Sequence, residues 1–366
     1  MLYAGTASTP LIVFYVPDAS SDRKLFGVRG MLLASALSAT GVRVALIFPA
    51  ARNQVELCLT DGQLCRSTAF AHFADLLTML ARLEGPHNIF VSCSAANIDV
   101  FGAVHRLKSS GWKTVYDIEY DVEDMHRLKL ISSYHFEVES MIVKLVDRVT
   151  ASSHRLLNKA ICFGVNPSKF SLIPNSNING SYQLEMEQIE GKVHASHAAN
   201  SVVGYLGSLD PAWFDWPLVL SIINKFPKLN FHFIGYNVPC RLKIPANLTI
   251  ECIDRVAGDY QSIISKWQIG LIAWRKSPAS LSINPLILHS YLWMGVTAIT
   301  SPLGCRHNNP YIYEYSNEDE FCRCLTTVLT RRVSYSDRAS LIDFLTRFNW
   351  QTSALSFMKC VNENFE

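Results

Sequence analysis

The fold of this chain is decided by residues 201–302, in which three short apolar runs each end in glycine or in a polar loop. The runs read VVGYLGS at 202–208, FHFIG at 231–235 and IGLIA at 269–273. Each is followed by residues with helical spacing, a pattern typical of parallel strands that feed helices. Ligands of such sheets bind at the carboxyl ends of the strands, where glycine lets the backbone approach a phosphate. The segment therefore predicts a nucleotide-binding domain.

The first half of the chain follows the same pattern. Apolar runs predict strands, and stretches with helical spacing between them predict helices. The predicted strands cover 11–16, 42–48, 88–93, 113–118 and 148–152, and the predicted helices cover 28–40, 73–83, 98–109, 135–146 and 154–163. The pattern weakens over 175–200, which we interpret as a linker with a short amphipathic piece at 182–189. Strand-helix alternation on both sides of a linker predicts two α/β domains, each an open parallel sheet.

Composition limits the class of protein. With 366 residues, 49% hydrophobic and 17% charged, the chain is long enough for two folded domains. A net charge of +2 argues against a nucleic-acid partner. The ten cysteines are scattered without a CxxC pair, so we expect no metal site. The apolar runs are far shorter than the ~20 residues of a membrane span, and no signal peptide is evident. We therefore expect a cytoplasmic protein.

The motifs of the second half resemble a known family. Gly-Tyr-x-Gly-Ser at 204–208, followed by Asn-Pro-Leu at 284–286, resembles the C-terminal domain of two-domain sugar-nucleotide glycosyltransferases of bacterial polysaccharide assembly. Further landmarks follow the same order in the rest of the chain: Val115-Tyr116-Asp117, Glu139, Leu172-Ile173-Pro174-Asn175 and Phe348-Asn349-Trp350. The resemblance implies the glycosyltransferase B-type (GT-B) architecture, two Rossmann-like domains that face a cleft. For this chain, the resemblance implies an acceptor domain at 1–178 and a nucleotide-sugar domain at 201–345, joined by a linker at 179–200. A C-terminal helix at 346–366 would pack on the first domain.

The resemblance also implies an activity. A sugar would pass from a nucleoside-diphosphate sugar, a UDP-sugar in the first instance, to a hydroxyl of a glycan or lipid-linked glycan. No cofactor beyond that donor substrate is implied. The protein would work in polysaccharide biosynthesis, with peripheral association at the inner face of the membrane. Two other interpretations stay open: a non-catalytic subunit that has lost donor binding, and a nucleotide-sugar epimerase, for which the second domain lacks an acid/base set.

Donor-binding candidates lie at predicted strand ends and helix starts of the second domain. A glycine at 207 leaves room for a diphosphate, an arginine after the strand at 269–273 offers it a bidentate fork, and the helix after Pro285 begins with free N–H groups. The expected donor set is Gly207, Ser208, Arg275, Lys276, Ser282, Asn284 and Ser290. Ile287 and Ser290 stand where relatives have a Lys and a Glu or Gln, which favours the non-catalytic interpretation. Among the tryptophans, Trp213 and Trp216 are the better candidates for stacking on sugar.

Catalytic candidates come from the acids that follow the strand at 113–118, namely Asp117, Glu119, Asp121, Glu123 and Asp124. Transfer to a hydroxyl needs a group that takes its proton, and acids at a strand end suit that role. We choose Asp121 first and Asp117 second, with a solvated helix start as the alternative for each. The loop after the first strand, with Arg23 and Gly27, is the candidate for binding acceptor or phosphate; a mobile surface loop is its alternative.

Overall fold

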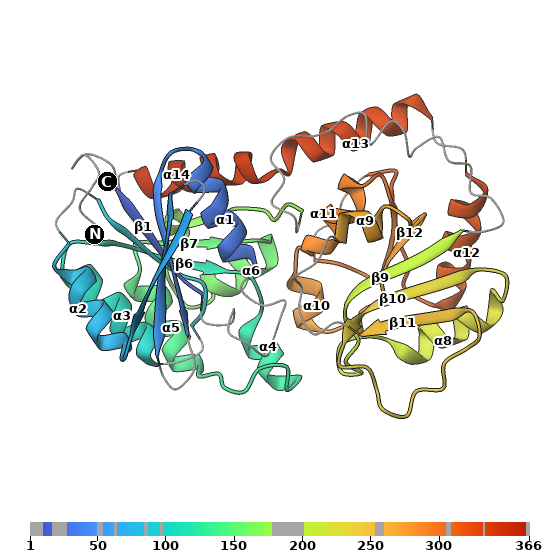
Figure 1. The fold of residues 1–366 in the computed structure, drawn as a ribbon, viewed down its shortest axis with the longest axis horizontal. Coiled ribbons are helices and arrows are strands. Elements are labelled where there is room, and N and C mark those ends of the chain that lie inside the picture. Colours follow the sequence, from blue (N-terminus) through green and yellow to red (C-terminus); the bar gives the residue numbers. More distant parts are fainter. Residues whose placement is uncertain are drawn as a thin grey trace. The chain divides into compact units, whose positions relative to one another are not determined.

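The structure of the protein is a computed structural model. It describes residues 10–16, 28–49, 54–61, 64–83, 87–95, 98–177, 201–252, 260–304, 309–331 and 334–363. Two compact units make up the chain. Unit 1 comprises Met1–Pro174 and Trp350–Glu366, and unit 2 comprises Asn175–Asn349. The chain therefore passes from one unit to the other twice, after Pro174 and after Asn349 (Figure 1).

Unit 1 is built on an eight-stranded sheet with the order β4-β3-β2-β1-β5-β6-β7-β8. Six neighbouring strands are parallel: β1 (Leu11–Tyr15), β2 (Arg43–Pro49), β5 (Ile89–Ser92), β6 (Lys113–Ile118), β7 (Arg148–Ala151) and β8 (Phe170–Leu172). An antiparallel hairpin, β3 (Val55–Asp61) and β4 (Leu64–Phe70), extends the sheet beside β2. The sequence patterns predicted no strands there. In β3 Val55 and Leu57 are buried while Glu56 is exposed, the alternation of a strand with one solvated face.

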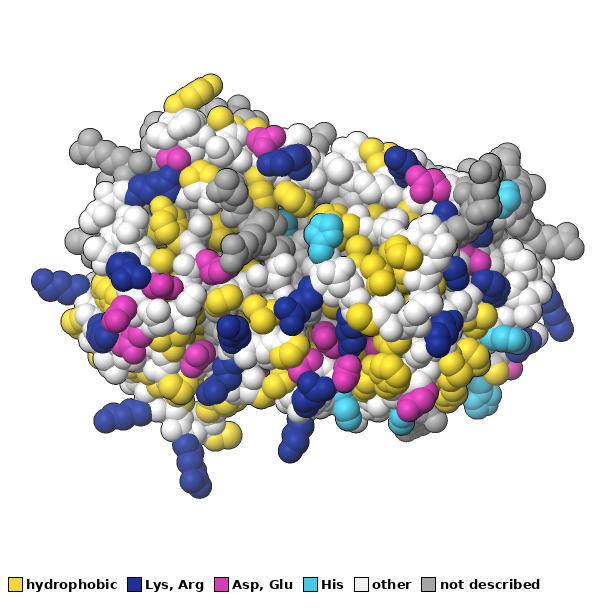
Figure 2. Space-filling model, turned by 180° about the vertical axis from the view of Figure 1, so that it is seen from behind, with side chains coloured by type: hydrophobic (Ala, Val, Ile, Leu, Met, Phe, Trp, Pro, Cys, Tyr) yellow, Lys and Arg dark blue, Asp and Glu magenta, His cyan; other side chains and the backbone are white. Residues whose placement is uncertain are grey.

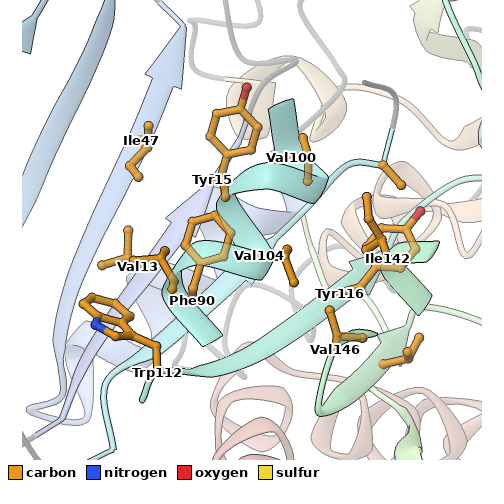
Figure 3. Packing of buried hydrophobic residues seen from close by; sticks show 14 of the residues in the cluster. Val13, Tyr15, Ile47, Phe90, Val100, Val104, Trp112, Tyr116, Ile142 and Val146 are labelled. Carbon is orange, nitrogen blue, oxygen red and sulfur yellow. The ribbon is translucent and has the colours of Figure 1, made fainter. Parts of the chain in front are cut away.

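Helices cover both faces of this sheet. The main core of unit 1 lies between the sheet and α2 (Phe73–Ala81), α3 (Ile98–Ser109), α5 (Phe136–Leu145) and α6 (His154–Ile161). Figure 3 shows Val100 and Val104 of α3 against Phe90 and Tyr15 of the strands. A short helix, α4 (Val122–Arg127), follows β6, and a 3-10 turn, η3 (Pro167–Lys169), precedes β8.

The chain's last helix belongs to unit 1. α14 (Trp350–Asn362) packs against α1 (Val28–Ala39) and against the opposite face of the sheet, where Phe357 lies 6.0 Å from the ring of Phe14. Two cations of the sheet hold its C-terminal carbonyls: Lys113 Nζ donates to Val361 at 2.8 Å, and Arg148 Nε donates to Cys360 at 2.8 Å. Cations at a helix C-terminus also oppose the negative end of its dipole.

Unit 2 is a six-stranded sheet in which every pairing is parallel, with the order β11-β10-β9-β12-β13-β14. Its strands are β9 (Val202–Ser208), β10 (Asn230–Tyr236), β11 (Leu248–Cys252), β12 (Ile269–Ile272), β13 (Thr297–Thr300) and β14 (Ile312–Glu314). Its helices are α8 (Trp216–Lys225), α9 (Tyr260–Ile264), α10 (Pro278–Ser282), α11 (Leu286–Trp293), α12 (Glu318–Thr330) and α13 (Tyr335–Arg347). One core packs α9, α11 and α13 on the sheet, and a second packs α8 and α12 on its other face.

The predicted fold class, two α/β domains built on open sheets that are mainly parallel, is confirmed. The expected linker at 179–200 and its amphipathic piece at 182–189 lie outside the described residues. Asn175–Asn177, which the sequence interpretation assigned to the first domain, are buried in unit 2. None of the helices in the described part of the chain is long and apolar enough to cross a membrane.

Candidate active site

Asp117, the second choice for the base, belongs to a buried ion pair. Arg29, in the first turn of α1, donates to it twice, from Nε to Oδ2 at 2.9 Å and from Nη2 to Oδ1 at 3.0 Å. Thr150 Oγ1 donates to Oδ1 at 2.6 Å. Both charged side chains are inaccessible, with 0% and 1% exposed. Burial by itself lowers the pKa of Arg29, but Asp117 outweighs that effect and raises it. A carboxylate that accepts three hydrogen bonds and is not exposed is poorly suited to take a proton from an acceptor, which favours a structural role for Asp117 over the predicted one.

Asp121, the first choice, lies where the sequence placed it, just after β6. It is the N-cap of α4, where its Oδ1 accepts from the backbone N–H of Asp124 at 3.2 Å. Aspartate is among the residues preferred at this position. Lys159 Nζ also donates to Oδ1. The side chain is 14% exposed, which leaves it reachable from solvent. Of the two predicted acids, only Asp121 combines partial exposure with a position at the carboxyl edge of the sheet.

Two side chains beside Asp121 were missed by the sequence analysis as site residues. Lys159 of α6 lies 3.3 Å from Glu123 and 4.0 Å from Glu139, measured from Nζ to the nearest carboxylate oxygen. Glu139 of α5 is buried and accepts hydrogen bonds from the hydroxyls of Tyr116 at 2.9 Å and Tyr134 at 2.7 Å. Burial raises the pKa of Glu139, partly against the effect of Lys159 and the two tyrosines. Asp121 caps α4, while Lys159, Glu139 and Tyr116 belong to α6, α5 and β6, in that order. Only the fold brings these four side chains together.

The remaining acids after β6 do not form one acidic surface with Asp121. Glu119 is buried and lies near Arg29. Glu123 and Asp124, on α4, pair with Arg127 one turn later, at 3.0 and 3.4 Å. The expected acidic cluster is thus divided among three cations: Asp117 and Glu119 lie near Arg29, Asp121 contacts Lys159, Asp124 contacts Arg127, and Glu123 contacts both Lys159 and Arg127.

In unit 2, Gly207 lies at the end of β9 and faces Gly235 of β10. Its φ of +152° falls in a region that side chains rarely adopt, and an added Cβ would stand 3.0 Å from the hydroxyl of Tyr205. A Cβ on Gly235 would lie 2.1 Å from the carbonyl oxygen of Gly207. Close packing within unit 2 therefore already requires glycine at these positions, whatever binds there.

The loop after β9 is joined to the loop after β12. The N–H of Asp215 donates to Ala273 at 2.9 Å, and the N–H of Arg275 donates to Trp213 at 2.8 Å. The side chains of Arg275 and Lys276 are exposed. Within the described part of the chain, no ion pair involves either of them. The predicted pair of cations therefore stands at a strand end next to the strand that carries Gly207 and the half-exposed Ser208.

The tryptophans expected to stack on sugar belong to the packed interior. Trp216 is the first residue of α8, is 5% exposed, and its Nε1 donates to the carbonyl of Leu209 at 2.8 Å. Trp213 is 7% exposed and packs against Trp274, with ring centroids 4.9 Å apart. The position of these residues in a loop suggested exposure, but their rings pack into the interior of unit 2.

Three expected donor residues are used inside unit 2. Ser282 Oγ donates to Ala279 at 2.8 Å, and Ser290 Oγ donates to Leu286 at 3.0 Å. Asn284 Oδ1 lies 2.7 Å from Nε2 of the buried His289. All three side chains are buried, so direct donor contact by their side chains is disfavoured. Hydroxyls that bond back to the preceding turn are common for serine in helices, a local alternative that spacing alone does not reveal.

The substituted family positions on α11 are also interior. Ile287 is 8% exposed and packs in the core with Leu288 and Tyr291. Every residue of α11 after Leu286 is buried. Ile287 and Ser290, which depart from the family pattern, thus lie on a helix that is buried on nearly all sides.

Arg23 and Gly27, the candidates in the first strand-to-helix loop, lie outside the described residues. The described chain resumes at the start of α1, where a Cβ on Gly30 would meet Cys93 Sγ at 2.6 Å and Val16 at 3.3 Å. Glycine at 30 therefore lets α1 begin close to the carboxyl ends of β1 and β5.

No family model matches this sequence, and no curated protein matches it. Similarity appears with solved structures. A UDP-forming α,α-trehalose-phosphate synthase from Burkholderia xenovorans is 10% identical, with a TM-score of 0.68 over 97% of this chain and 99% of that chain. Anabaena HepE, in complex with UDP and glucose, is 12% identical, with a TM-score of 0.62 over 96% of this chain and 98% of that chain. The synthase in complex with glucose-6-phosphate aligns with a TM-score of 0.65 at 11% identity, over 96% and 100%.

At this identity the similarity establishes the fold. It extends over nearly the whole of each chain, both sheets included. The chain has the GT-B fold, the architecture that the order of its sequence motifs implied.

Proposed function

We propose that the protein is a glycosyltransferase that uses a UDP-sugar as donor. The observation that carries the proposal is the similarity over the whole length of the chain to one protein described as UDP-forming and to another solved with UDP and glucose. Arg275 and Lys276, exposed at the end of β12, are the side chains best suited to the diphosphate, because charge-assisted bonds from arginine to phosphate are strong and bidentate. Gly207 and Ser208, at the end of the adjacent β9, complete the proposed donor site.

The remaining parts of the proposal concern the acceptor side. Asp121 is the proposed base that takes the proton of an acceptor hydroxyl, because it is the partly exposed acid at the carboxyl edge of the unit 1 sheet. The order of the sequence motifs supports a glycan or lipid-linked glycan as acceptor, in polysaccharide assembly at the inner face of a membrane. In this proposal the two units are the acceptor and donor domains of a GT-B enzyme.

Calorimetric titration with UDP and with GDP tests the donor proposal directly. UDP should bind more tightly than GDP, and UDP-glucose should bind at the same site in competition with UDP. Replacing Arg275 with alanine should weaken UDP binding by about 10- to 150-fold, the equivalent of ~1.5–3 kcal/mol for a hydrogen bond to a charged group. Arg323→Ala is the matched control, since Arg323 is an exposed arginine on α12, outside the proposed site. Equal affinities of the two variants would remove Arg275 from the donor site, and no binding of UDP by the parent protein would contradict the proposal.

A second candidate function is a glycosyltransferase-like subunit without catalysis. The buried Ile287 and Ser290 favour it, because neither supplies the cation or the carboxylate found at these positions in relatives. Measured release of UDP from UDP-glucose separates the candidates. A protein that binds UDP but releases none from UDP-glucose, with or without sugar acceptors, would fit the subunit.

A further inference from the structure

We propose that Lys159 is a positioning residue for Asp121, and that it leaves Oδ2 of Asp121 as the oxygen that takes the acceptor's proton. The inference rests on the proposed glycosyl transfer and adds a residue to it. In that step the acceptor oxygen forms a bond to the anomeric carbon. The bond from that carbon to the UDP oxygen breaks, its electron pair leaves with UDP, and the acceptor's proton passes to Asp121.

The contacts of Asp121 are one-sided. The backbone N–H of Asp124 and the ammonium of Lys159 both donate to Oδ1. No hydrogen bond from the described residues reaches Oδ2. A carboxylate fixed by one oxygen is held in a defined orientation, while the second oxygen keeps its capacity to accept a proton.

Another lysine–aspartate pair of unit 1 shows the contrast. Asp147 receives Lys108 Nζ on Oδ1 at 2.6 Å, and the N–H and hydroxyl of Thr114 on Oδ2 at 2.8 and 2.9 Å. Both of its oxygens are occupied, as expected of a carboxylate that ties α3 and β6 to the segment after α5. The two pairs are similar in composition, yet only the one at the carboxyl edge of the sheet leaves an oxygen open.

Lys159 is itself held in place from the interior. Its ammonium lies 4.0 Å from Glu139 and 5.7 Å from the centre of the Tyr134 ring. Glu139 is in turn fixed by two tyrosine hydroxyls, one from β6 and one from just before α5. Burial by itself lowers the pKa of Lys159, but Glu139, Asp121 and Glu123 outweigh it and raise it. The lysine therefore stays charged at neutral pH and joins α4, α5 and α6 at one point.

Three acidic side chains and one tyrosine surround the ammonium group of Lys159. Asp121 and Glu123 face it from α4, Glu139 from α5, and Tyr134 from the segment before α5. Three carboxylates surround one cation, so loss of the cation leaves Asp121 beside like charges with no counter-charge. A displacement of the carboxylate oxygen by about 1 Å is enough to slow a positioned proton transfer ~10²-fold.

The test compares Lys159→Met and Lys159→Arg, with Lys108→Met as the matched control. The probe is UDP-glucose, with UDP release measured in the absence and presence of free glucose. Lys159→Met should lower kcat ~10–100-fold while KM for UDP-glucose and the affinity for UDP change less than about threefold. Lys159→Arg should restore most of the rate. Lys108→Met should lower Tm about as much as Lys159→Met does, because each variant removes one lysine–aspartate pair. Its kcat should nevertheless remain that of the parent protein.

Further outcomes separate this inference from the proposed function. In a Lys159→Met, Asp121→Asn double variant, kcat should fall no further than in Asp121→Asn alone, because the two residues act as a unit. A parent-like kcat in Lys159→Met, or equal losses in Lys159→Met and Lys108→Met, would overturn the positioning role while the transferase proposal stands. Failure of Lys159→Arg to improve on Lys159→Met would also overturn it. If the parent protein releases no UDP at all, the proposed function fails and the inference falls with it. Lys159→Gln replaces Lys159→Met if the latter does not fold.

Discussion

Replacing Arg29 with methionine should destabilise unit 1 strongly, because it leaves the Asp117 carboxylate buried without its counter-charge. Arg29 is 0% exposed, Asp117 is 1% exposed, and two N–H···O bonds of 2.9 and 3.0 Å join them. After the substitution, the Thr150 hydroxyl still donates to Oδ1 of that carboxylate at 2.6 Å, but it carries no charge. Methionine fills much of the volume of the arginine stem, so the change is mainly one of charge.

The expected magnitude follows from the burial of both partners. Removing one member of a buried ion pair costs about 3–5 kcal/mol, since the desolvated charge that remains has lost its compensation. For a domain of this size, ~1 kcal/mol lowers Tm by about 2–4 °C, so the unit 1 transition should fall by roughly 6–20 °C. The double variant Arg29→Met, Asp117→Val removes both charges and should recover at least half of that loss, because paired charges replaced by apolar groups are often nearly neutral.

Calorimetry on the single and double variants measures these shifts, with UDP present and absent to separate the transitions of the two units. A fall in Tm of less than about 2 °C for Arg29→Met would refute the reasoning. So would a double variant less stable than the sum of the two single changes. A third result would be as damaging: an Asp117→Asn protein with the Tm of the parent and no turnover of UDP-glucose, which would return Asp117 to the reacting centre.

Three further outcomes are expected. Gly204→Ala should lower the Tm of unit 2, because its Cβ would fall 1.8 Å from Trp267, and overpacking of this kind costs ~1–3 kcal/mol; an unchanged Tm would contradict it. For Asp147, burial by itself raises the pKa, but Lys108 and Thr114 outweigh it and lower it, so its stabilisation is present above about pH 4 and is lost as the pH falls through the folded-state pKa. Asp147→Asn should therefore lower Tm at pH 7, and the difference from the parent should close on acidification. Asp121→Asn should keep Tm and UDP affinity and lower turnover of UDP-glucose ~10²–10⁴-fold; near-normal turnover would exclude Asp121 as base.

Elements with strong local signals were predictable from the sequence. The helix at 98–109 and the strand at 113–118 have the predicted bounds. Each has a single clear pattern, helical spacing in the first and a short run rich in β-branched and aromatic residues in the second, and Gly111 marks the boundary between them. Gly111 has a φ of +84°, the left-handed conformation that ends a helix. By contrast, no element was predicted over 318–330 or 335–347. The capping box of Ser334 and Asp337 was a usable local signal for the second of these helices.

The composition of the candidate site was less predictable, because its contacts join residues far apart in the chain. Arg29 and Asp117 are 88 positions apart, and Lys159 and Asp121 are 38 positions apart. Spacing places an acid at a strand end, but it does not say which cation the fold will bring to it. The sequence ranked Asp121 above Asp117 by distance from the strand alone, whereas their different partners and exposures supply a second reason to prefer Asp121 as the proposed base.

Among the expected donor-binding residues of unit 2, side-chain exposure decides which ones could reach a diphosphate. Asn284 and Ser282 precede a helix, and that position favoured phosphate binding until their side chains proved to be buried and bonded within unit 2. Arg275 and Lys276 had the weaker sequence argument, a basic dipeptide after a strand, yet they are exposed at the strand end. An anionic diphosphate needs donors it can reach, and α11 is buried after Leu286 and contains no lysine or arginine. In the proposed donor site, Arg275 and Lys276 would supply the positive charge that the buried, apolar Ile287 of α11 cannot supply.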